Sequence, residues 1–104
     1  MLSKNRIAII GSGNLGTSIA GGLIKENFPP SNIFLTRRKT ELLEIFAQKG
    51  VHIGSDNIKA VQSADIIIIA VKPYKISEII EEIAPHVQVN QLLISVVSGI
   101  SIEK

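Results

Sequence analysis

Cysteine and tryptophan are absent from this 104-residue chain, and aromatic residues make up only 4% of it. Without cysteine, the chain has no disulfide, no thiolate metal site and no thiol nucleophile. It also lacks a long hydrophobic segment, because the longest central apolar run, residues 66–71, is far too short to cross a bilayer. The net charge is only +2, which gives no reason to expect nucleic acid or a membrane as a partner.

A secretory signal is not apparent, because the basic stretch Lys4-Asn5-Arg6 is followed by only four apolar residues before Gly11. We therefore expect a cytoplasmic location. The acidic residues and the histidines lack the spacing of metal ligands, so no metal site is expected.

Apolar residues make up 45% of the chain and are mostly aliphatic, as in parallel sheets whose strands are buried on both faces. Strand and helix patterns alternate, which predicts a single α/β domain over residues 1–104. Right-handed crossovers then predict a Rossmann-type parallel sheet of five strands in the order 3-2-1-4-5, with helices on both faces. The expected strands cover residues 6–10, 33–36, 51–53, 66–71 and 92–97, and the expected helices cover about 14–26, 40–49, 58–62 and 76–83.

A Gly-x-Gly-x-x-Gly motif, formed by Gly11, Gly13 and Gly16, lies between the first expected strand and the first expected helix. This order of strand, glycine turn and helix is typical of dinucleotide-binding sites. Gly11 permits the turn, Gly13 leaves room for a pyrophosphate, and Gly16 lets the helix pack against the strand. The N–H groups at the helix start then attract the phosphate charge. A glycine turn without any ligand is the alternative.

The end of the second expected strand indicates which dinucleotide binds. NAD-binding proteins commonly place a carboxylate about 20 residues beyond the glycine motif, where it bonds the ribose hydroxyls. This chain has Thr36 there, followed by Arg37, Arg38 and Lys39. A hydroxyl and three cations favour the 2′-phosphate of NADP, with NAD as the weaker ligand. The alternative is a solvated basic turn that pairs with the acidic residues of the next helix.

These motifs together resemble the N-terminal cofactor domain of pyrroline-5-carboxylate reductase. The resemblance covers essentially the whole chain and implies an NAD(P)H-dependent oxidoreductase that reduces L-1-pyrroline-5-carboxylate to L-proline in proline biosynthesis. Ser98 departs mildly from the family, which often has a small residue such as alanine there. The matching segments are residues 9–16, Thr36-Arg37-Arg38, Asp56-Asn57, Ala64-Asp65, Ala70-Val71-Lys72-Pro73 and residues 94–100.

The resemblance also implies a cofactor site without a catalytic residue, because the cofactor carries the chemistry. Two parts of this site have plainer explanations. Asp56 or Asn57 could cap the helix expected over residues 58–62, and Lys72-Pro73 could simply begin a helix. The expected cofactor-binding residues are Gly11, Ser12, Gly13, Asn14, Leu15, Gly16, Thr36, Arg37, Arg38, Asn57, Ala70, Val71, Lys72, Pro73, Ser98 and Gly99.

The family binds its small-molecule substrate and dimerises through a C-terminal helical domain, which we expect to be absent from these 104 residues. The chain alone is therefore expected to bind cofactor without turnover, and the full-length protein to be a homo-oligomer. Two alternatives stay open. One is another NADP-dependent reductase of the same superfamily, of the deazaflavin-dependent type, and the other is a non-catalytic nucleotide-sensing module. A methyltransferase is disfavoured. Methyltransferases of this fold commonly hold the ribose with an acidic residue after the second strand, and this chain has no acidic residue there.

Overall fold

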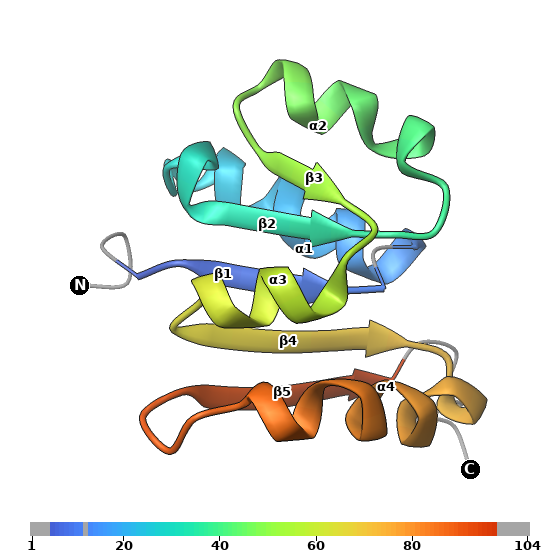
Figure 1. Cartoon of the computed structure of the whole chain (residues 1–104). Helices are drawn as coiled ribbons and strands as arrows, with labels where there is room; N and C mark the ends of the chain where they lie inside the picture. The colour runs from blue at the N-terminus through green and yellow to red at the C-terminus, as the bar shows by residue number, and fades with distance from the viewer. Residues whose placement is uncertain (1–4, 12, 98–104) are drawn as a thin grey trace, which may run out of the picture.

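Five strands form the centre of the computed structural model, which describes residues 5–11 and 13–97. They are β1 (Ile7–Ile10), β2 (Ile33–Thr36), β3 (His52–Gly54), β4 (Ile66–Val71) and β5 (Leu92–Val97). All pairings are parallel, and the strand order is β3-β2-β1-β4-β5 (Figure 1). The predicted fold class and strand order are confirmed.

Helices cover both faces of this sheet. In the described part of the chain they are α1 (Asn14–Lys25), α2 (Glu44–Gln48), α3 (Asn57–Ser63) and α4 (Ile76–Ile83). Apolar residues of α1 and α2 pack against one face of the sheet, and apolar residues of α3 and α4 pack against the other. Short 3-10 helices lie at Pro30–Asn32, Thr40–Leu43, Pro73–Lys75 and Ala84–His86.

Two details around the shorter helices differ from the sequence-based expectations. The helix expected from about residue 40 begins as a 3-10 helix and becomes α2 only at Glu44. Asp56, and not Asn57, caps α3, since its Oδ1 accepts a hydrogen bond of 3.1 Å from the Lys59 N–H. Of the two caps that the sequence allowed, Asp56 is confirmed and Asn57 is wrong.

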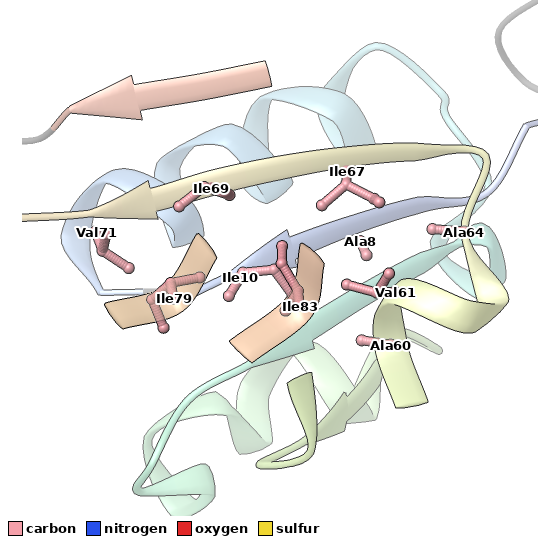
Figure 2. Packing of buried hydrophobic residues seen from close by; sticks show 10 residues of the cluster. All are labelled: Ala8, Ile10, Ala60, Val61, Ala64, Ile67, Ile69, Val71, Ile79 and Ile83. Atoms are coloured by element: carbon pink, nitrogen blue, oxygen red, sulfur yellow. The ribbon is translucent and has the colours of Figure 1, made fainter. Parts of the chain in front are cut away.

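Alternation along β1 divides the core into two layers. Ala8 and Ile10 pack under α3 and α4, whereas Ile7 and Ile9 pack under α1. Figure 2 shows the first layer, in which side chains of β4 meet those of α4. Its buried members are Ala8, Ile10, Ala60, Val61, Ala64, Ile67, Ile69, Val71, Ile79 and Ile83.

The edge formed by β5 is covered less completely than the rest of the sheet. Leu92, Leu93 and Ile94 are all exposed. Ile80 of α4 is also 38% exposed, although it lies four residues after Ile76 and three before Ile83, the spacing of one apolar helix face. The buried apolar clusters therefore involve β1, β2 and β4 more than this edge.

Ile67→Ala should destabilise the protein by about 2–5 kcal/mol, because Ile67 is fully buried between β1, α3 and α4 and its loss leaves a cavity. Ile80→Ala removes the same atoms from a partly exposed position and should cost less than about 1.5 kcal/mol. Urea unfolding of both variants checks the difference. Equal losses would contradict the core described above.

Candidate cofactor site

The turn between β1 and α1 has the backbone that its first glycine predicts. Gly11 has φ +76, which L side chains rarely adopt. A Cβ at Gly11 would overlap Cγ1 of Val71, at the end of β4. The Gly11 carbonyl accepts a hydrogen bond of 2.7 Å from the Gly13 N–H, which keeps the turn tight. The fold itself therefore requires glycine at position 11.

Gly13 is in a different situation. Its φ of −82 lies outside the left-handed region, and a Cβ there would meet nothing within 4 Å. The surrounding protein atoms therefore do not demand a glycine. Gly13 faces the cavity described below, so the missing side chain leaves space that a ligand can fill.

The start of α1 carries an uncompensated positive end. Among the residues that the structure describes, no side chain caps this helix and its first turn holds no acid. In contrast, Asp56 caps α3. The first backbone N–H groups of any helix lack a helical partner. At the start of α1 an anion could therefore accept hydrogen bonds from them. Gly16 and Ala20, both buried, keep the sheet-facing side of α1 small.

A cavity of about 380 Å³ opens beside the glycine turn, at the carboxyl ends of the strands. It lies where the strand order reverses between β1 and β4, the place where such sheets bind ligands. Four of its described lining residues are cationic and none is acidic. The lining residues are Gly11, Gly13, Asn14, Leu15, Arg37, Arg38, Ala70, Val71, Lys72, Tyr74 and Lys75.

Most of the predicted site residues lie together in this lining, although they come from three separate strand ends. Four predicted residues, Gly16, Thr36, Asn57 and Pro73, are described but are not among the lining residues. Pro73 begins a 3-10 helix, as in the plainer explanation of Lys72-Pro73. Ser12, Ser98 and Gly99 lie outside the described residues.

Thr36 and Asn57 each make a contact that the sequence did not indicate. The Thr36 hydroxyl is buried and accepts a hydrogen bond of 3.2 Å from the Gly11 N–H. The Asn57 amide donates a hydrogen bond of 3.0 Å to Oε1 of Glu82, on α4. A second hollow, of about 370 Å³, lies next to this region, and Thr36, Ser55 and Asp56 are among its lining residues.

Residues 6–99 match the family model described as NADP oxidoreductase, coenzyme F420-dependent. The chain belongs to this family. It is also 41% identical over 102 residues to pyrroline-5-carboxylate reductase 2 of Dictyostelium discoideum. The aligned region covers 96% of this chain and 34% of that protein.

Two solved structures of pyrroline carboxylate reductases are similar to this chain. A pyrroline-5-carboxylate reductase from Coxiella burnetii has a TM-score of 0.84 at 33% identity, covering 93% of this chain and 37% of that one. A pyrroline carboxylate reductase from Plasmodium falciparum with NADP bound has a TM-score of 0.73 at 25% identity. The match covers 96% of this chain and 36% of that one. The resemblance to the cofactor domain of these reductases is confirmed, and the chain spans about a third of the length of the relatives described here.

Tyr74 and Lys75 also line this cavity, and the sequence reasoning did not include them. They follow Lys72-Pro73 in a 3-10 helix that keeps the chain beside the cavity after β4 has ended. The rule that ligands bind beyond the carboxyl ends of strands could have included them. Tyr74 is 75% exposed, so its ring is accessible at the cavity.

Other kinds of site have little support in this family member. Within residues 5–11 and 13–97, no three His, Cys, Asp or Glu side chains form a group that could hold a metal ion. In the same ranges, every buried polar side-chain atom has a hydrogen-bond partner. None of the helices described there has the length and apolar character needed to cross a membrane.

Proposed function

We propose that this chain is the NADPH-binding part of a reductase of the pyrroline-5-carboxylate type, which reduces L-1-pyrroline-5-carboxylate to L-proline. The observation that carries the proposal is the cavity at the glycine turn, which is lined both by the start of α1, where no described side chain forms a cap, and by four cationic residues. Such a site suits a ligand with several phosphate charges. The Plasmodium relative, described with NADP bound, supports the same ligand.

Each part of the cavity has a role in this proposal. The N–H groups of Asn14 and Leu15 bind the pyrophosphate, in the space beside Gly13. Arg37 and Arg38 bind the 2′-phosphate, because a guanidinium matches phosphate oxygens. The adenosine lies toward the second hollow, near Asn57, which directly follows its lining residue Asp56.

The nicotinamide half lies along the end of β4 and the residue after it, where Ala70, Val71 and Lys72 line the cavity. When bound, the cofactor supplies a hydride to the imine carbon. The described residues position the dinucleotide and contribute no acid or base to that step in this proposal. Ser98 and Gly99, which lie outside the described residues, are proposed to bind the same half of the cofactor.

The substrate part of the proposal rests on the relatives. We propose that the imino acid binds to protein beyond the aligned third of those reductases, in a helical domain that also makes the homo-oligomer. A cytoplasmic location is proposed for the same enzyme. A deazaflavin-dependent NADP reductase falls within the family description but is the weaker candidate, because the relatives described above are named as pyrroline carboxylate reductases. A nucleotide sensor with this fold would bind the cofactor without supporting turnover.

NADPH should bind more tightly than NADH, by about 10- to 100-fold, since one charge-assisted hydrogen bond to phosphate contributes about 1.5–3 kcal/mol. Arg38→Ala should reduce this ratio markedly, because Arg38 lines the cavity. Lys39→Ala is the matched control, since Lys39 is exposed and is not among the lining residues. Calorimetric titration at fixed salt measures both ratios, and equal affinities in the unmutated chain would overturn the proposal.

A further inference from the structure

Thr36 ends β2 at the point where the chain turns toward the two arginines of the cavity. Its side chain is buried, with only 2% of the residue exposed. The hydroxyl oxygen accepts a hydrogen bond of 3.2 Å from the N–H of Gly11, 25 residues earlier in the chain. This contact joins the end of β2 to the first residue of the glycine turn.

The Gly11 N–H belongs to a residue with a positive φ at the end of β1, where the strand ladder stops. A donor in such a partly buried place needs an acceptor, and the Thr36 hydroxyl provides one. The hydrogen bond therefore holds the turn in the conformation that presents Gly13 and the start of α1 to the cavity.

The Thr36 hydroxyl is engaged within the protein, although Thr36 is also among the residues that line the second hollow. Thr36 is not among the residues that line the cavity, whereas its neighbours Arg37 and Arg38 are. The backbone N–H of Arg37 donates a hydrogen bond of 3.0 Å to the Gly54 carbonyl, which fixes the chain direction directly after Thr36. The sequence placed the Thr36 hydroxyl on the 2′-phosphate, and its observed contact is with the glycine turn.

We propose that Thr36 is a positioning residue whose hydroxyl sets the glycine turn for the pyrophosphate, whereas the choice between NADPH and NADH is made by Arg37 and Arg38. The proposal rests on the function proposed above. The pyrophosphate is common to both dinucleotides, so losing the hydroxyl weakens both by the same factor. Removing an arginine instead changes the ratio between them.

The test compares Thr36→Val, which removes the hydroxyl and keeps the shape, with Thr36→Ser, which keeps the hydroxyl. Thr36→Val should weaken NADPH and NADH equally, by about two- to tenfold, the range of one neutral hydrogen bond. Thr36→Ser should restore most of the affinity for both. A fall in NADPH affinity alone would show that Thr36 contacts the 2′-phosphate, and unchanged affinity for both would show that the hydroxyl does not position the turn. Either result overturns the proposal.

Amide hydrogen exchange at Gly11 gives a readout that does not depend on ligand. The Gly11 N–H should exchange slowly in the unmutated chain and in Thr36→Ser, and faster in Thr36→Val, while the amides of β4 stay unchanged. If Thr36→Val fails to fold, the proposal is tested by the Thr36→Ser titration and by the Gly11 amide of the unmutated chain. A rapidly exchanging Gly11 amide in the unmutated chain contradicts the contact with Thr36. If the unmutated chain binds neither dinucleotide, the proposed function fails together with the binding role of Thr36, and a protected Gly11 amide then supports only the contact.

Discussion

Gly13→Val is expected to abolish NADPH binding while the protein stays folded. The backbone at Gly13 has φ −82, and an added Cβ would meet nothing within 4 Å, so the fold has room for the side chain. That room belongs to the cavity in which we place the pyrophosphate. A branched side chain there would keep the phosphates away from the N–H groups of α1 and from the arginines. Several charge-assisted contacts would be lost together, so we expect affinity to fall by more than about 100-fold.

Calorimetric titration measures the affinity, and far-UV circular dichroism with thermal unfolding shows whether the variant is folded. Gly22→Ala is the matched control, because Gly22 is an exposed residue of α1 with nothing within 4 Å of its built Cβ and is not among the cavity residues. It should bind NADPH normally and be more stable by about 0.5–1 kcal/mol, as for alanine replacing glycine in a helix. A folded Gly13→Val variant with normal affinity would show that the phosphates lie elsewhere.

The local pattern of apolar and turn residues in the sequence was sufficient to predict most of the fold. The bounds of β2, β4 and β5 were predicted to the residue, because each is a short, mostly apolar run between turn or polar residues. The order of the strands followed from the handedness of crossovers. The exposure of Ile80 was not predictable from helical spacing, since it depends on how much of β5 the helix covers.

The sequence predicted which segments line the cavity at the glycine turn, and it predicted individual side-chain contacts less well. The strand-end rule located the glycine turn, the arginines and the segment after β4. It could not show that the Thr36 hydroxyl turns toward Gly11, or that the Asn57 amide reaches Glu82. Both contacts join residues far apart in the chain, and their direction is decided by packing between elements that the sequence pattern does not describe.

Gly11→Ala is expected to destabilise the protein by about 2–5 kcal/mol. An L residue in the left-handed region costs about 1–2 kcal/mol, and forcing an extra carbon into a filled space costs about 1–3 kcal/mol. Both costs apply at Gly11, whose φ is +76 and whose added Cβ would overlap Val71 Cγ1. A domain of this kind is stable by only about 5–15 kcal/mol, so the loss is large. Urea unfolding measures it, and Gly13→Ala, with an open site and an ordinary φ, should cost far less.

A double-mutant cycle with Val71→Ala separates the two costs at Gly11. Val71→Ala removes the methyl group that an added Cβ at Gly11 would overlap, but it does not change the positive φ. Gly11→Ala should therefore cost less in the Val71→Ala background than in the unmutated chain, with a coupling of about 0.5–3 kcal/mol. The part of the cost that remains belongs to the backbone conformation. If Gly11→Ala costs the same in both backgrounds, Val71 is not what excludes a side chain from the turn. If it costs nothing in either, the turn relaxes freely and glycine is not required by the fold at this position.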